Sequence, residues 1–268
     1  MHKCGWMMSA GLLFFVAVPC NDTRAQATPA QTPAQPKAAT GSTPAHKPAA
    51  TSPYDRLLLR PASLTAKAPA TYQVKFTTTK GDFVISVTRA WAPLGADRFY
   101  NLVRHHFYDN TTFFRVHPKF VVQWGISAYP PVTAAWEHAP IKDDVVVQSN
   151  LRWYVTYAKT GEPDTRTTQV FINLVDNPRL DTVGGFAPFG QVTEGTDVVD
   201  ALFSGYGEAP PDGQGPDQDK INKIGKPYLD KGFPNLDSIK TTTLILPSGA
   251  APAKPSTAAK PAPAPQKQ

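Results

Sequence analysis

Apolar and polar residues alternate along two short stretches of the chain, 72–76 and 83–87, with turn-forming residues between them. A period of two residues is typical of a strand that buries one face, so the pattern predicts a β-hairpin. Further short apolar stretches predict strands at 112–116, 121–123, 152–158, 168–173, 189–192 and 241–246. Strands this short, separated by turn residues, favour a mainly β fold.

Two stretches have the spacing of helices instead. Pro93 suits the first turn of a helix, and apolar residues such as Phe99 and Leu102 then recur on one face. A second, shorter helix is predicted over 196–203, whereas 204–235, rich in Gly, Pro and Asp, is predicted to be irregular. Many strands with only two helices predict a closed or nearly closed β-barrel capped by helices.

The first 27 residues have the pattern of a secretory signal peptide. Lys3 precedes an apolar stretch at 7–18, and Ala25-Gln26-Ala27 provides a small-residue cleavage site. The apolar stretch is shorter than a bilayer-spanning helix, so no retained membrane span is expected. Lipidation at Cys20 is the alternative. The proline before that cysteine fits a lipidation site poorly, and cleavage after Ala27 is favoured.

Low-complexity stretches flank the predicted barrel. Residues 28–70 and 247–268 consist largely of Pro, Ala, Thr and Lys, with too few apolar residues to offset the entropy cost of ordering. We therefore expect a disordered linker at 28–70, a folded domain at 71–246 and a disordered tail at 247–268. Within the linker, Leu57-Leu58-Leu59 is expected to pack on the outside of the domain.

The positive charge of the chain lies mainly outside the predicted domain. The formal net charge is +6, yet residues 71–246 contain 17 Lys and Arg against 19 Asp and Glu. A nucleic-acid-binding domain concentrates basic residues on its folded surface, so a nucleic-acid partner is disfavoured.

Neither thiol chemistry nor a metal site is expected in the mature protein. Both cysteines, Cys4 and Cys20, lie in the predicted signal peptide, so no disulfide is expected even in an oxidising compartment. His105 and His106 are adjacent rather than four residues apart, which favours a solvated pair over a metal site. The acidic residues around Asp217 lack the spacing of an EF-hand. We expect no cofactor.

Two segments contain the residue types of a peptide-binding slot, in the order Phe-Phe-Arg-Val-His-Pro-Lys-Phe-Val-Val-Gln and Thr-Thr-Gln-Val-Phe-Ile-Asn. The side chains concerned are those of Arg115, Phe120, Gln123, Gln169 and Phe171. One arginine, two glutamines and several phenylalanines on one face describe an apolar slot with a few placed hydrogen-bond donors. Singly, each has an ordinary interpretation as a surface charge, a core ring or a strand-edge amide. Only the combination is specific.

These segments resemble the cyclophilin family. The family pattern of Phe-Phe/His-Arg, a Pro-containing turn, Phe-x-x-Gln and then Ser/Thr-Gln-x-Phe-Ile extends here over roughly 72–246, with a further match at 157–163. The resemblance implies a closed eight-stranded antiparallel barrel with a helix at each end and the site on its outer face. It also implies a peptidyl-prolyl cis/trans isomerase, an enzyme that acts without a metal or a nucleophile.

The resemblance assigns a role to each residue of the slot. The proline pocket would be lined by Phe120, Val121, Phe171 and Leu180. Arg115 would donate hydrogen bonds to the prolyl carbonyl and approach the prolyl nitrogen, and Gln123 would position both Arg115 and the substrate. Gln169 would reach the residues before proline. The backbone of Ala158 and Lys159 would pair with the bound peptide.

The sequence departs from the family pattern at the rim of the slot. Arg179 aligns with a tryptophan of the binding face in many cyclophilins, and Phe186 aligns with the usual histidine. Lys119 replaces the turn glycine, and Trp153 stands where a glycine is frequent. Arg179 and Phe186 are therefore retained as substrate-binding positions with an altered rim.

The favoured interpretation is a monomeric, periplasmic prolyl isomerase whose partners are proline-containing peptides and unfolded exported proteins. A non-catalytic proline-peptide binding module, or a holdase chaperone on the same scaffold, is the main alternative. Arg115 favours the enzyme, whereas the altered rim keeps the alternative open. A third interpretation is an envelope protein recruited through its tails, with the barrel as a spacer.

Export makes the first testable prediction. Expressed in a Gram-negative host, the chain should be recovered from the periplasm with Thr28 as its first residue, because the signal peptide is removed after Ala27. Intact-mass and N-terminal peptide analysis measure this directly. A chain that retains residues 1–27, or one that begins at a lipid-modified Cys20, would contradict the prediction.

Overall fold

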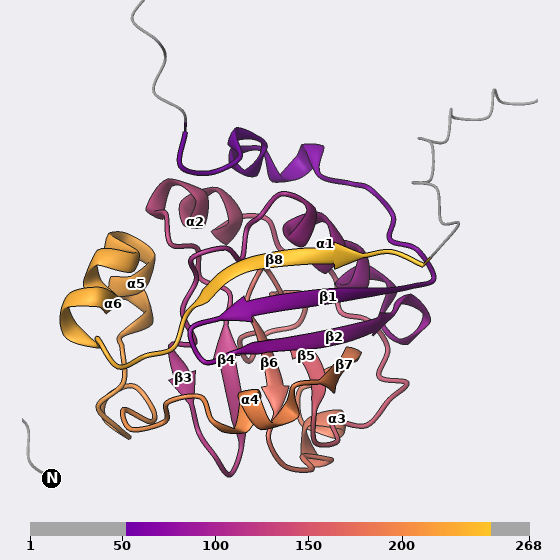
Figure 1. The fold of residues 1–268 in the computed structure, drawn as a ribbon. Helices are drawn as coiled ribbons and strands as arrows, with labels where there is room; N and C mark the ends of the chain where they lie inside the picture. Colours follow the sequence, from indigo (N-terminus) through magenta and orange to yellow (C-terminus); the bar gives the residue numbers. More distant parts are fainter. Residues whose placement is uncertain (1–51, 248–268) are drawn as a thin grey trace, which may run out of the picture. The chain divides into compact units, whose positions relative to one another are not determined.

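The computed structural model describes residues 52–247, which form one curled β-sheet with short helices around it (Figure 1). The strands are β1 (Thr71–Thr78), β2 (Asp82–Thr88), β3 (Arg115–Val116), β4 (Val121–Trp124), β5 (Tyr154–Tyr157), β6 (Val170–Asn173), β7 (Pro188–Glu194) and β8 (Ile239–Ile245). Each coincides with, or overlaps, a strand predicted from the sequence.

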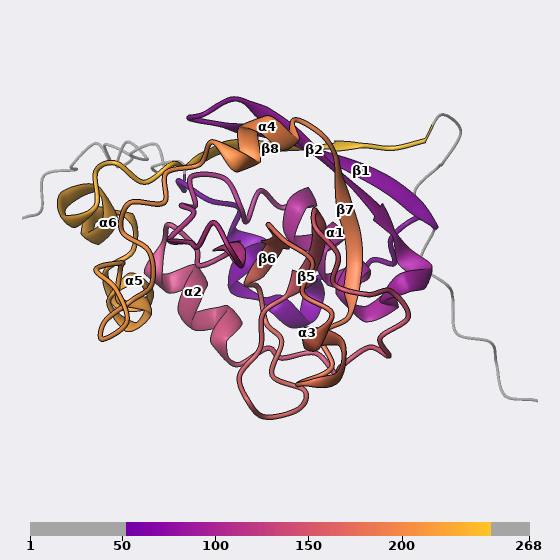
Figure 2. The same cartoon turned by 90° about the horizontal axis from the view of Figure 1, so that it is seen from below.

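All strand pairs are antiparallel, and the order across the sheet is β3-β4-β6-β5-β7-β2-β1-β8. Figure 2 shows β7 connecting the β1–β2–β8 side of the sheet to the β5–β6 side. The two edges meet at one bridge, Thr112 to Ser238, between the segments that lead into β3 and β8. The predicted eight-stranded antiparallel architecture is therefore confirmed, as a curled half-barrel whose two edges approach each other at this bridge without a continuous ladder between β3 and β8.

The strands differ in how many of their faces are buried. Along β1, buried side chains such as Val74 and Phe76 alternate with partly exposed ones, because only one face meets the core. All four residues of β4 and of β6 are buried. Their inner face packs in the core, where the Trp124 ring contacts those of Phe76 and Phe113. Their outer face must therefore be covered by something other than the core.

The helices are more numerous than predicted. They are α1 (Pro93–Arg104), α2 (Pro130–Glu137), α3 (Arg179–Thr182), α4 (Thr196–Asp200), α5 (Gln218–Ile224) and α6 (Lys226–Gly232), with 3-10 turns η1 (Arg56–Leu59), η2 (Pro61–Ser63) and η3 (Arg89–Trp91). Helix α1 begins at Pro93 as predicted, and α4 occupies the first part of the predicted 196–203 helix. Helix α2 was not predicted, because Pro130 and Pro131 suggest a turn, whereas here they occupy its first turn.

The expectation of an irregular segment at 204–235 is wrong in its second half. Helices α5 and α6 form there because each buries one apolar residue, Ile221 and Leu229, against Phe114 and Ile126 on the barrel. This second apolar cluster holds the α5–α6 pair beside β3, on one side of the molecule in Figures 1 and 2. None of the helices in the described part of the chain is long and apolar enough to cross a membrane.

Residues 54–70 pack on the barrel, which corrects the expectation of disorder for this part of the linker. Leu58 is 1% exposed and belongs to the main core, so the Leu57-Leu58-Leu59 segment packs on the domain as expected. Trp136 of α2 donates its indole N–H to the Leu58 carbonyl at 2.8 Å. The Asp55 carboxylate lies 2.7 Å from His105 at the end of α1. The predicted signal peptide, linker residues 28–51 and tail residues 248–268 lie outside the described residues.

This packing makes a stability prediction. Replacing Leu58 with Ala should lower the free energy of unfolding by about 2–5 kcal/mol, because it empties a buried site in the core. The matched control is Leu57→Ala, since that neighbouring side chain is 45% exposed; it should change stability by about 0.5 kcal/mol or less. Urea unfolding of both variants measures the difference. Equal small effects would show that residues 54–70 do not contribute to the core.

Candidate active site

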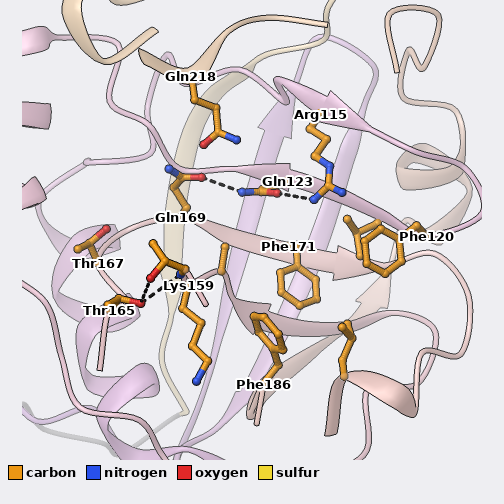
Figure 3. A pocket seen from close by; sticks show the side chains of 14 residues that line it. Arg115, Phe120, Gln123, Lys159, Thr165, Thr167, Gln169, Phe171, Phe186 and Gln218 are labelled. Atoms are coloured by element: carbon orange, nitrogen blue, oxygen red, sulfur yellow. Dashed lines mark hydrogen bonds between the residues drawn. The ribbon is translucent and has the colours of Figure 1, made fainter. Parts of the chain in front are cut away.

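A pocket of about 360 Å³ lies on the outer face of β3, β4 and β6, where the sheet is buried on both sides (Figure 3). It brings together all but one of the residues predicted from sequence. These are Arg115, Phe120, Val121, Gln123, Ala158, Lys159, Gln169, Phe171, Leu180 and Phe186. The side chains that line the pocket, among them Phe120, Lys159 and Phe186, therefore shield the outer face of β4 and β6.

Strand register places the key side chains in one row. Arg115 of β3 is directly opposite Gln123 of β4, and Gln123 is directly opposite Phe171 of β6. Residues that face each other across antiparallel strands project from the same side of the sheet. The neighbouring row, which contains Val122 and Ile172, points into the core instead.

A chain of hydrogen bonds links the polar side chains of this row. The Arg115 Nη1 donates to Gln123 Oε1 at 3.0 Å, and Gln123 Nε2 donates to Gln169 Oε1 at 2.7 Å. Gln123 is only 7% exposed, so both ends of its amide need partners, and the two bonds provide them. The Gln123 amide therefore fixes one edge of the Arg115 guanidinium at the side of the pocket.

The pocket floor is apolar. Phe120 and Val121 come from the start of β4, Phe171 from β6, and Leu180 from α3. The Phe171 ring meets the Phe186 ring edge-on at 5.9 Å, and the Arg115 guanidinium lies 5.3 Å from the centre of the Phe120 ring. A small apolar ring can enter here beside a cation that stays at the edge.

The opposite side of the pocket carries a second cation, which is paired. Lys159, whose side chain is 7% exposed, lies 2.6 Å from Asp143 and 5.7 Å from the centre of the Phe186 ring. Burial tends to raise the pKa of Asp143, but the hydrogen bond from Lys159 and the nearby cations outweigh it and lower that pKa. Asp143 therefore stays ionised and holds the Lys159 ammonium in place.

Several pocket residues were not predicted from sequence. Thr160, Thr165 and Thr167 line its polar end, and Gln218 reaches it from α5. Thr160 and Thr167 lie within the two matching segments, at 157–163 and 167–173, and Thr165 lies between them, so the sequence held a usable signal for all three. Gln218 belongs to the segment expected to be irregular, and nothing in its local pattern indicates a site.

Two predicted details differ in the structure. Arg179 does not line the pocket; its side chain is exposed at the start of α3, next to Leu180, which does line it. The Ala158 N–H donates to the Gln169 carbonyl at 2.9 Å. A peptide could pair with the Ala158 carbonyl but not with this N–H, because the Gln169 carbonyl already accepts it.

A partly exposed carboxylate, that of Asp181, holds the wall that carries Leu180 and Phe186. Asp181 accepts hydrogen bonds from the Ser149 hydroxyl at 2.5 Å and from the Asn150 N–H and Nδ2 at 2.9 and 2.8 Å. The Asn150 amide also donates to the Phe186 carbonyl at 2.8 Å. Burial tends to raise the pKa of Asp181, but these hydrogen bonds outweigh it and lower that pKa below its ordinary value of 3.8.

The described residues contain no group of three or more His, Cys, Asp or Glu side chains placed to hold a metal ion. What the fold and the pocket define is a β-barrel with an apolar, arginine-edged slot on its outer face, suited to a peptide with a small ring.

Comparison with known proteins identifies the family. The model of the cyclophilin type peptidyl-prolyl cis-trans isomerase/CLD family matches residues 73–226. A peptidyl-prolyl cis-trans isomerase of Acinetobacter baylyi is 36% identical over 146 residues, which cover 52% of this chain and 76% of that protein. Peptidyl-prolyl cis-trans isomerase B of Escherichia coli is 35% identical over 136 residues, 48% of this chain and 82% of that protein.

A solved cyclophilin type isomerase from Cryptosporidium parvum aligns with 66% of this chain and 99% of its own, at a TM-score of 0.49 and 18% identity. The family match covers more than half of the chain, and this chain belongs to the cyclophilin-type peptidyl-prolyl cis-trans isomerases. Its isomerase activity follows by homology.

The Asp181 contacts make a pH-dependent prediction. Because the pKa of Asp181 is lowered in the folded state, its ionised form stabilises the fold above pH 3.8, and this contribution is lost as the pH falls through the lowered pKa. Asp181→Asn should therefore be less stable than wild type at pH 7, with a difference that shrinks below about pH 4. Urea unfolding at pH 7 and pH 3 measures this.

Glu162→Gln is the control for removing one surface carboxylate, since its side chain is exposed. Suppose the difference in free energy of unfolding between wild type and Asp181→Asn is the same at both pH values. The carboxylate is then not held as described.

Proposed function

We propose that this protein isomerises Xaa-Pro bonds of exported proteins in the periplasm and thereby assists their folding. The signal-peptide pattern of residues 1–27 supports export, and the absence of cysteine after residue 20 is compatible with an oxidising compartment. The mildly acidic composition of residues 71–246 favours a peptide substrate over a nucleic acid. Unfolded exported chains are the substrates that meet these conditions.

The chemistry requires only that a twisted amide be stabilised. Amide resonance gives the Xaa-Pro bond a rotational barrier of roughly 20 kcal/mol, and no covalent bond breaks during rotation. As the bond twists, the lone pair of the prolyl nitrogen localises and becomes a hydrogen-bond acceptor. A fixed donor aimed at that nitrogen therefore binds the transition state more tightly than the planar ground state.

The observation that carries this mechanism is the position of the Arg115 guanidinium, held by Gln123 at the edge of an apolar pocket. The proline ring would occupy the pocket formed by Phe120, Val121, Phe171 and Leu180. Its nitrogen would then lie at the edge, within reach of Arg115. Gln169, bonded to Gln123, would face the residues that precede proline.

Arg115→Ala should lower the catalysed exchange rate by about 10²–10³-fold while leaving peptide affinity nearly unchanged, because the lost interaction belongs mainly to the transition state. Phe120→Ala should instead weaken binding, because it opens the pocket that receives the ring. Arg115→Lys should not restore the rate, since an ammonium lacks the planar fork of a guanidinium. Two-dimensional exchange NMR of an Ala-Pro peptide, with a titration for Kd, measures both quantities.

The matched control is Arg152→Ala, which removes an exposed arginine paired with Asp200 outside the pocket, and its rate should equal that of wild type. An Arg115→Ala variant as fast as wild type would rule out this mechanism. If wild type binds the peptide without accelerating exchange, the protein is a proline-peptide binding module.

A further inference from the structure

The Arg115 guanidinium has a second partner, on the side away from Gln123. Its Nε and Nη2 donate to the two carboxylate oxygens of Glu208 at 2.7 and 2.8 Å. The side chains of both residues are 27% exposed, so the pair is partly shielded from water. Glu208 belongs to the segment between α4 and α5 and is 93 residues from Arg115 in the chain.

Residues 204–217, here called the Glu208 loop, wrap around the backbone of Glu208. The Gly215 N–H donates to the Glu208 carbonyl at 2.7 Å, and a Cβ at Gly213 would lie 2.3 Å from that same oxygen. At Gly215 a Cβ would lie 2.8 Å from it. Real side chains do not fit at such distances, so both positions require glycine. The loop therefore packs closely around the Glu208 backbone and restrains its position.

Aromatic packing fixes the base of this loop. The Tyr206 ring lies 5.1 Å from that of Phe203 and 5.1 Å from that of Phe233, with both contacts edge-on. Phe233 follows α6, which is anchored on the barrel through Leu229. The backbone that carries Glu208 is therefore held by hydrogen bonds within the loop and by the contact of Tyr206 with Phe233.

A count of donors shows what this arrangement leaves for a substrate. A guanidinium has five N–H groups in a rigid plane. Glu208 accepts from Nε and from one N–H of Nη2, and Gln123 accepts from one N–H of Nη1. One N–H on each Nη then has no partner among the described residues. A bidentate pair on one edge and an amide on another fix the plane in which these two donors lie.

We propose that Glu208 is a positioning residue for the isomerase reaction, which holds the guanidinium plane of Arg115 so that its two remaining N–H groups stay directed at the substrate. The inference rests on the role of Arg115 given under the proposed function. Glu208 acts through Arg115 and does not itself line the pocket. The ion pair with Glu208 preorganises Arg115. Because the guanidinium does not have to be ordered during the reaction, it is a better directional donor.

A purely structural ion pair would give a different result. Surface pairs contribute little to stability, so removal of the Glu208 carboxylate should hardly change unfolding. A positioning role instead predicts a loss in rate without a loss in affinity. It also predicts that the loss depends on the presence of Arg115.

The test compares Glu208→Ala, Glu208→Gln and wild type by exchange NMR on the same Ala-Pro peptide. We expect Glu208→Ala to lower the catalysed rate about tenfold, with Kd changed less than about twofold and an unchanged midpoint of unfolding. Glu208→Gln keeps one acceptor for the guanidinium and should lose less. The matched control, Asp212→Ala, removes a carboxylate from the same loop that does not contact Arg115, and should behave as wild type.

A double-mutant cycle separates positioning from a direct effect. In the Arg115→Ala background, Glu208→Ala should cause no further loss, because the residue it orients is gone. The Arg115 Nε–H signal provides a readout independent of catalysis: it should be observable in wild type and lost in Glu208→Ala.

Two results would overturn the positioning role and leave the proposed function standing. One is a Glu208→Ala variant that catalyses exchange as fast as, or faster than, wild type. The other is a Glu208→Ala substitution that lowers the rate equally with and without Arg115. Lack of catalysis by wild type would overturn both, whatever the Nε–H signal shows.

Discussion

The register of β3, β4 and β6 is the constraint on which the active site depends. Arg115, Gln123 and Phe171 share one row, and a slip of one residue would turn that row into the core. Close contact at the end of β4 fixes the register of β4 with β6. Gly125 has φ +108°, a Cβ there would lie 2.5 Å from the Thr168 carbonyl oxygen, and the Thr168 hydroxyl donates to the Gly125 carbonyl at 2.8 Å. No other residue fits this approach, so β4 and β6 have one alignment.

The same register creates a problem that the site solves. Burial of both faces of β4 places the polar side chain of Gln123 where water is scarce, and an unpaired amide there would be costly. Its two hydrogen bonds, from Arg115 and to Gln169, satisfy the amide and order its neighbours at the same time. The buried amide of Gln123 thus connects Arg115 to Gln169 at the far end of the pocket.

Much of this could be predicted from the sequence, because strands and their faces are encoded locally. Alternation predicts the opening hairpin and places Gln169 with Phe171, and short apolar stretches predict the other six strands. The long family pattern assigns a role to Arg115. Helix α2 was missed because its two opening prolines suggest a turn. Glu208 could not be found by any local rule. It has no periodic neighbours, and its contact joins residues 93 positions apart through a segment whose composition predicts only irregular chain.

Packing, rather than charge, decides that Glu208 meets Arg115. Phe114, the residue before Arg115, is buried with Ile126 against Ile221 and Leu229 of α5 and α6. That cluster seats the α5–α6 pair on β3, and Phe233 beyond α6 contacts Tyr206 at the base of the Glu208 loop. Both ends of the ion pair are therefore anchored to the same apolar cluster. A partly exposed ion pair is too weak to order a loop, but apolar burial can do so. The ion pair then only has to orient a guanidinium that is already within reach.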